Sequence, residues 1–273
     1  MDRDLVGLTL ISPGVATLRG IGVLVALALY PVLGLCRPNP IEFLWGWNWS
    51  RLKKPLPVAP LPPELKERSE RIDRRYLRPI QYGLLCGCVY LLMRKYALTA
   101  AAVGFNLNHW ERFLGLGVAA GVVYLAYLRL VVAMNKTLLP APVPDGSIDH
   151  LTRGSAILWF FNHVVGCLGE EFWRAFCLVS LERVHRGAAF AVVATSLAFA
   201  LGHYQTGHPA PFTLGLLFSY TLFGMLFGGM FFWTGSIVPT YIGHLLINSV
   251  TLYQARRKRA TGGSETSGST ECV

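Results

Sequence analysis

Residues 155–181 read SAILWFFNHVVGCLGEEFWRAFCLVSL, and they are the most informative part of the sequence about the fold. It is long enough to cross a bilayer as a helix, which takes about 20 mostly apolar residues. It nevertheless contains His163, Glu170, Glu171 and Arg174. Ionisable side chains are costly inside a membrane, so they have to face other protein and not lipid. The stretch therefore predicts a membrane helix that lies inside a bundle and carries a polar site on its buried face.

The rest of the chain supplies the other helices of such a bundle. Of its 273 residues, 53% are hydrophobic and only 15% are charged, whereas soluble domains average roughly a quarter charged. Apolar stretches alternate with short basic ones, which is typical of a protein that crosses the membrane several times. The predicted fold is all-α and polytopic, with about seven transmembrane helices, at residues 15–36, 79–98, 113–134, 155–181, 188–203, 212–233 and 237–253.

The positive charge of the chain has a membrane explanation. The net charge is +10, but the basic residues flank apolar stretches and no soluble domain remains to bind nucleic acid, so we exclude nucleic acid as a partner. Segment 37–78 contains ten Lys and Arg residues against five acidic ones, and Arg256–Arg259 is a basic run. Basic flanks mark the cytoplasmic side. We therefore predict a multi-pass protein of the plasma (inner) membrane with a cytoplasmic C-terminus.

Polar residues recur at helical spacing in three of the predicted spans. Glu170 and Arg174 are four residues apart, as are His244 and Asn248, and His203 ends the predicted span 188–203. Residues i and i+4 share one face of a helix. Three polar stripes that must avoid lipid are most cheaply accommodated if they face one another around a common cavity.

The chemistry of this set favours hydrolysis. A carboxylate beside an imidazole can take a proton from water and deliver it to a leaving amine. A second imidazole and a carboxamide can donate hydrogen bonds to a developing oxyanion. No Ser or Cys residue lies in a clear nucleophilic context. The set therefore favours peptide hydrolysis with water as the nucleophile.

Three motifs in this region resemble those of a known family. Glu170–Arg174 (EEFWR), Phe199–His203 (FALGH) and His244–Asn248 (HLLIN) occur on separate predicted spans. In this order they resemble the CAAX protease and bacteriocin-processing (CPBP, or Abi) family, which includes type II CAAX prenyl endoproteases. The resemblance implies an intramembrane endopeptidase that acts on a membrane-associated or lipidated protein. It also implies that Glu170 and His203 activate water, that His244 and Asn248 form the oxyanion hole, and that Arg174 orients the glutamates.

The first motif departs from the family pattern. The family has two glutamates, three further residues and then arginine, whereas this chain has only two residues between Glu171 and Arg174. If the glutamates are aligned, Glu170 takes the catalytic position. If the arginines are aligned, Glu170 matches the second glutamate and Gly169 replaces the first. We favour Glu170 because its i, i+4 spacing predicts a pair with Arg174, and Glu171 remains the rival base.

Three questions stay open at this point. We predict no cofactor, with zinc held by Glu170, His203 and His244 as the alternative; the HExxH pattern of many zinc proteases is missing. Two other functions remain possible: a non-catalytic membrane protein of the bacteriocin-immunity type, and a proton-coupled carrier. The expected partners are a membrane-associated protein or peptide substrate and the lipid bilayer, and the oligomeric state is not specified.

These predictions divide the chain into three regions. Residues 1–154 form a three-span N-terminal region that includes the basic cytoplasmic segment 37–78, part of which is predicted to be an amphipathic surface helix. Residues 155–253 form a four-helix catalytic core of the CPBP kind. Residues 254–273 are a basic and polar tail that we expect to be disordered.

Overall fold

The described part of the chain is helical throughout. A computed structural model describes residues 22–32, 78–134, 153–185, 187–203 and 210–262. All regular structure within these ranges is helix, as predicted. In chain order the elements are the helix Gly22–Val32, α4 (Arg78–Lys95), the 3-10 helix η3 (Ala101–Val103), α5 (Trp110–Met134), α6 (Arg153–His185), α7 (Ala188–Gly202), α8 (Ala210–Thr234) and α9 (Val238–Gly262).

Each of the seven predicted spans overlaps one of these helices. Two helices contain a segment long and apolar enough to cross a membrane, Trp110–Val131 in α5 and Leu214–Thr234 in α8. Gly22–Val32 and α7 are apolar but shorter. The all-helical class is therefore confirmed for the described residues, and the number of spans stays a prediction.

The end of the chain differs from the prediction. The last span was expected to end at residue 253 and to be followed by a disordered tail. Instead α9 continues as a helix to Gly262, because the residues beyond 253 include Ala, Lys and Arg, which have high intrinsic helix propensity. Disorder was therefore wrong for residues 254–262. The predicted surface helix and most of segment 37–78 lie outside the described residues.

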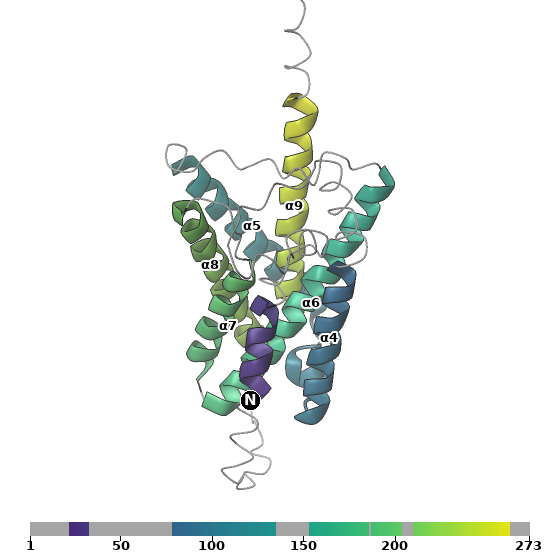
Figure 1. Ribbon diagram of the computed structural model, residues 1–273, viewed down its shortest axis with the longest axis vertical. Coiled ribbons are helices and arrows are strands. Elements are labelled where there is room, and N and C mark those ends of the chain that lie inside the picture. Colours follow the sequence, from purple (N-terminus) through teal and green to yellow (C-terminus); the bar gives the residue numbers. More distant parts are fainter. Residues whose placement is uncertain (1–21, 33–77, 135–152, 186, 204–209, 263–273) are drawn as a thin grey trace, which may run out of the picture.

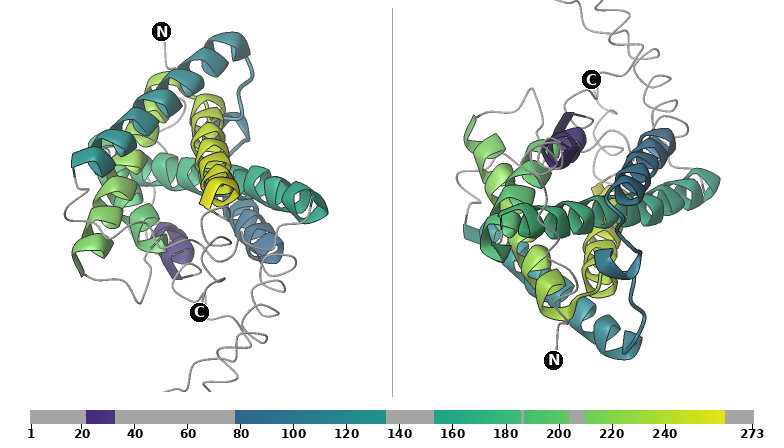
Figure 2. Two further views of the ribbon diagram at one scale, coloured as in Figure 1. Left: turned by 90° about the horizontal axis from the view of Figure 1, so that it is seen from above. Right: turned by 90° about the horizontal axis from the view of Figure 1, so that it is seen from below.

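Helix α6 occupies the centre of the molecule. It contacts α4, η3, α7, α8 and α9. The helices stand side by side in Figure 1, where α9 extends beyond its neighbours at one end. Both views of Figure 2 show α6 crossing the molecule, with Gly22–Val32 and α4 on one side and α5 and α9 on the other. Polar residues on α6 can therefore meet side chains from most of the other helices.

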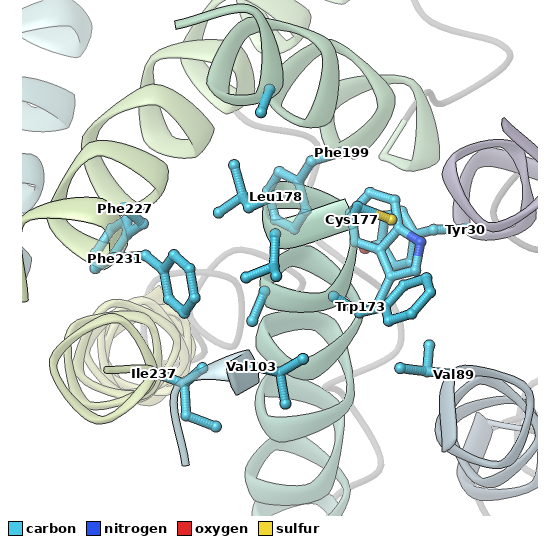
Figure 3. Packing of buried hydrophobic residues seen from close by; sticks show 14 of the residues in the cluster. Tyr30, Val89, Val103, Trp173, Cys177, Leu178, Phe199, Phe227, Phe231 and Ile237 are labelled. Carbon is cyan, nitrogen blue, oxygen red and sulfur yellow. The ribbon is translucent and has the colours of Figure 1, made fainter. Parts of the chain in front are cut away.

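Apolar and aromatic side chains fill the space around α6. In Figure 3, Tyr30 and Val89 approach Trp173 on one side of α6, while Phe227 and Phe231 lie on the other. The Trp173 indole is fully buried and donates a hydrogen bond from Nε1 to the carbonyl of Ala26 at 2.7 Å. This bond joins helix Gly22–Val32 to the middle of α6.

The outside of the bundle is largely apolar, and a few charged side chains are buried inside it. Large apolar side chains on α5 and α8, such as Val122 and Phe218, are exposed on the outside of the bundle. Charged side chains of α6, such as Glu171 and Arg174, are buried inside it. An apolar exterior with ionisable groups turned to the bundle interior suits a lipid environment.

Glycines allow neighbouring helices to approach closely. A β-carbon at Gly117 of α5 would lie 2.6 Å from the carbonyl oxygen of Pro239, so α5 and α9 touch along their backbones. A β-carbon at Gly224 of α8 would lie 2.7 Å from Ser196 Cα of α7. Helices α7 and α8 therefore approach each other closely at Gly224, whereas a β-carbon at Gly229 would have nothing within 4 Å. Small residues of this kind are typical of helix pairs in membranes.

The connection between α8 and α9 fixes where α9 begins. Gly235 adopts a left-handed conformation with φ 64°, which a glycine accepts without steric cost and which reverses the chain. The amide of Ile237 then donates to the carbonyl of Gly104 at 3.0 Å. The start of α9 is therefore tied to the segment between α4 and α5.

Candidate active site

The predicted site residues come from three helices. Glu170, Glu171 and Arg174 lie on α6, His203 caps the C-terminus of α7, and His244 and Asn248 lie on α9, as the following contacts show. The two glutamates, Arg174 and His244 are buried, with exposed fractions of 5%, 1%, 1% and 4%. His203 and Asn248 are partly buried.

Glu171 is the carboxylate around which the buried charges gather. Nη1 of Arg174 lies 2.9 Å from Oε1 and 3.0 Å from Oε2 of Glu171. Nδ1 of His244 lies 2.8 Å from Glu171 Oε1. A carboxylate can only accept hydrogen bonds, so Nδ1 of His244 carries a proton and donates a hydrogen bond to Glu171. Glu171 thereby fixes the orientation of the imidazole on α9.

The predicted pairing of Glu170 with Arg174 is wrong, because Arg174 pairs with Glu171 at i, i+3 spacing. The guanidinium carbon of Arg174 also lies 4.3 Å from the centre of the Phe199 ring and 5.1 Å from that of Phe223. These rings on α7 and α8 attract the cation to a position where Glu171 is the nearer carboxylate. The preference for Glu170 as base thus loses its original reason.

Glu170 has a different set of neighbours. Its Oε1 accepts a hydrogen bond from the Tyr82 hydroxyl of α4 at 3.0 Å. Its Oε2 lies 3.7 Å from Nε2 of His244, which is too long for a hydrogen bond. Glu170 also interacts electrostatically with His203, and Tyr30 is a second hydrogen-bonding neighbour. Both predicted imidazoles therefore lie near this carboxylate.

His203 is oriented by the end of its own helix. Its Nδ1 lies 3.0 Å from the carbonyl oxygen of Phe199 and 3.4 Å from the Tyr30 hydroxyl. The Tyr220 ring of α8 stacks on the imidazole with 4.2 Å between ring centres. A carbonyl only accepts hydrogen bonds, so Nδ1 carries the proton, and Nε2 of a neutral ring is the nitrogen that can accept one.

Asn248 lies one helical turn beyond His244 and faces the same helix. Its Nδ2 donates a hydrogen bond to the sulfur of Cys167 on α6 at 3.2 Å. Because His244 contacts Glu171 and Asn248 contacts Cys167, one face of α9 is turned toward the polar face of α6. The predicted cavity shared by these helices is thus matched by direct contacts.

The residues do not form a recognisable metal site. Within residues 22–32, 78–134, 153–185, 187–203 and 210–262, no three His, Cys, Asp or Glu side chains form a group that could hold a metal ion. The alternative zinc ligands Glu170, His203 and His244 therefore have no matching cluster. Nδ1 of His203 is also turned to its own helix carbonyl.

Sequence reasoning missed two tyrosines of the N-terminal region. Tyr82 contacts Glu170 and Tyr30 contacts His203, whereas every site residue predicted from the sequence lies in the region 155–253. A buried tyrosine hydroxyl usually has a hydrogen-bond partner. A tyrosine within a predicted span could therefore have indicated a contact with the polar site. Tyrosine is also common where spans meet the membrane surface, so the signal was ambiguous.

Comparison with known proteins supports the resemblance. Residues 152–250 match the family model described as type II CAAX prenyl endopeptidase, Rce1-like. The match covers a little over a third of the chain and includes all three motifs. It confirms the predicted resemblance and indicates CAAX protease activity in general. No curated protein and no solved structure matches the chain.

Proposed function

We propose that this chain is an intramembrane endopeptidase that hydrolyses a peptide bond of a membrane-associated or lipidated protein. The observation that carries the proposal is the buried position of His244 between two carboxylates, 2.8 Å from Glu171 and 3.7 Å from Glu170. Charges are expensive in such an environment and are retained mainly for function. The family match names prenylated CAAX proteins as the substrate class to test first.

Glu170 is the base in this proposal. Glu171 is already engaged by Arg174 and His244, whereas Oε2 of Glu170 lies 3.7 Å from Nε2 of His244, too far for a hydrogen bond between them. Glu170 takes a proton from water while the water oxygen bonds to the substrate carbonyl carbon. Nε2 of His203 shares this proton and helps return it to the leaving nitrogen when the C–N bond breaks.

The oxyanion is stabilised from α9. As the carbonyl electron pair moves to oxygen, Nε2–H of His244 and Nδ2–H of Asn248 donate hydrogen bonds to it. Two buried carboxylates and one guanidinium leave one negative charge uncompensated, and a doubly protonated His244 neutralises it. Such a His244 donates from Nδ1 to Glu171 and from Nε2 to the oxyanion. Glu171 and Arg174 then act as positioning residues.

The two glutamates are separated by comparing matched variants. Glu170→Gln should lower kcat at least about a thousandfold, because loss of the general base removes both proton transfers, with a small change in thermal stability. Glu171→Gln should lower the thermal midpoint more, because it leaves Arg174 buried without its counter-charge. The assay uses purified protein in proteoliposomes and a prenylated CAAX peptide with a fluorophore upstream of the cysteine and a quencher at the C-terminus.

The same assay tests the other open questions. Activity that persists after dialysis against a strong zinc chelator supports a metal-independent reaction, and loss that zinc restores contradicts it. Cleavage retained in Glu170→Gln would contradict the assignment of the base. An immunity-type protein or a carrier would show no Glu170-dependent cleavage of any membrane peptide, which a comparison of membrane-protein termini between cells making the wild type and Glu170→Gln would reveal.

A further inference from the structure

We propose that the hydroxyls of Tyr82 and Tyr30 are positioning groups for the Glu170–His203 pair, so that the N-terminal helices complete the site. Both tyrosines precede the family-matched segment 152–250. The inference rests on the proposed function, since it assigns further residues to the same reaction.

Tyr82 fixes one oxygen of the proposed base. Its hydroxyl donates to Oε1 of Glu170 at 3.0 Å, which leaves Oε2 as the oxygen on the His244 side. A hydrogen bond to a charged acceptor is stronger than one between neutral groups and sets the geometry of the acceptor. A carboxylate held this way presents the same oxygen to the water in each catalytic cycle.

The surface of α6 is shaped to admit the Tyr82 ring. A β-carbon at Gly166 would lie 3.0 Å from Cε2 and Cζ of Tyr82, and one at Gly169 would lie 3.4 Å from its Cδ1. Gly166, one turn before Glu170, thus provides the space in which the ring lies, and Gly169, directly before Glu170, lies against the same ring. With the ring in this position, the Tyr82 hydroxyl lies within hydrogen-bonding distance of the Glu170 carboxylate.

Tyr30 links the two reacting side chains. Its hydroxyl lies 3.4 Å from Nδ1 of His203 and also hydrogen-bonds with Glu170. Because Nδ1 carries a proton, the hydroxyl can accept from the imidazole and donate to the carboxylate. Its ring is buried and stacks on Trp173 and Phe199, with ring centres 4.7 and 5.7 Å apart. Tyr30 therefore sets the relative placement of base and imidazole.

The first test removes single hydroxyls. Tyr82→Phe and Tyr30→Phe should each lower kcat for the prenylated CAAX peptide about ten- to a hundredfold, the range for one hydrogen bond to a charged group. KM should change less than about twofold, because neither group is proposed to bind substrate. Tyr124→Phe is the matched control: it removes a buried hydroxyl that donates to the Ser219 carbonyl at 2.8 Å, and it should leave kcat nearly unchanged.

A second test moves the ring without removing the hydroxyl. Gly166→Ala should lower kcat in the wild type but add no further loss in Tyr82→Phe, because both changes act through one contact. Gly87→Ala on α4 is the control, since a β-carbon there meets nothing within 4 Å. Equal losses from Gly166→Ala with and without the Tyr82 hydroxyl would overturn the inference.

Failure of the inference is distinguishable from failure of the proposed function. If Glu170→Gln abolishes cleavage while Tyr82→Phe and Tyr30→Phe behave like Tyr124→Phe, only the inference fails. If the wild type does not cleave this peptide, the inference is tested by stability. The thermal midpoints of Tyr82→Phe, Glu170→Gln and the double variant then show whether the two side chains interact. Non-additive shifts support a direct link between the hydroxyl and the carboxylate, and additive shifts overturn it.

Discussion

Arg174 shows how a single residue connects the stability of the bundle to its site. Its Nη1 bonds Glu171 at 2.9 Å, and its charge lies over Phe199 and Phe223. Among the described residues, its Nε and Nη2 atoms have no hydrogen-bond partner. The aromatic rings therefore provide much of the compensation for burying this charge.

Replacing Arg174 should destabilise the protein strongly. Arg174→Met leaves the Glu171 carboxylate buried without its counter-charge, which costs about 3–5 kcal/mol. We expect a clearly lower thermal midpoint in detergent, measured by the loss of helical circular dichroism. The exposed Arg129 of α5 is the control, and Arg129→Met should change the midpoint little. Equal midpoints for the two variants would contradict this account of the charge cluster.

Arg174 also marks the limit of what sequence spacing reveals. Glu170 and Glu171 are both within helical reach of Arg174, so spacing alone could not choose between them. The choice depends on where α7 and α8 place two phenylalanine rings, which is a tertiary feature. The motifs did predict which helices meet at the site, because each had to hide a polar stripe from lipid.

At the scale of elements, the contact between α5 and α9 determines where His244 lies. A β-carbon at Gly117 would meet the Pro239 carbonyl oxygen at 2.6 Å and Ile242 Cβ at 2.8 Å. Neither neighbour can move aside as the end of a flexible side chain could. The spacing between the two helices is therefore fixed by the lack of a side chain at this position.

Gly117→Ala should push the two helices apart. Overpacking of this kind costs about 1–3 kcal/mol, so we expect a lower thermal midpoint together with reduced activity, because α9 carries His244 and Asn248. Gly115→Ala, two residues away on α5, has nothing within 4 Å of its β-carbon and is the matched control. Similar midpoints for both variants would show that the helices can separate freely here.

The elements themselves were largely readable from the sequence. Long apolar stretches with short polar connections predicted every described helix longer than one turn, since such stretches favour helices in a membrane. Helix ends were less predictable: α6 runs from Arg153 to His185 and α9 to Gly262, beyond their apolar segments. Charged residues can continue a helix once it leaves the bilayer, so hydropathy does not mark its end.

For the whole molecule, the predicted orientation places the C-terminus in the cytoplasm. The basic run Arg256–Arg259 favours that side. With Cys272 as the only cysteine retained, a membrane-impermeant maleimide should label the protein in lysed cells but not in intact ones. Ser12→Cys in the same background should label in intact cells, because an odd number of spans puts the N-terminus outside. Labelling of Cys272 in intact cells would reverse the orientation.

Because the chain is synthesised from its N-terminus, the position of α9 in the sequence determines when the proposed site becomes complete. Tyr30 is made early, Glu170 and His203 follow, and His244 and Asn248 arrive with the last helix. The ribosome adds residues from the N-terminus, so a growing chain lacks the two proposed oxyanion donors until α9 has been translated. Under the proposed function, the chain therefore stays inert beside other newly inserted proteins until α9 has joined the bundle.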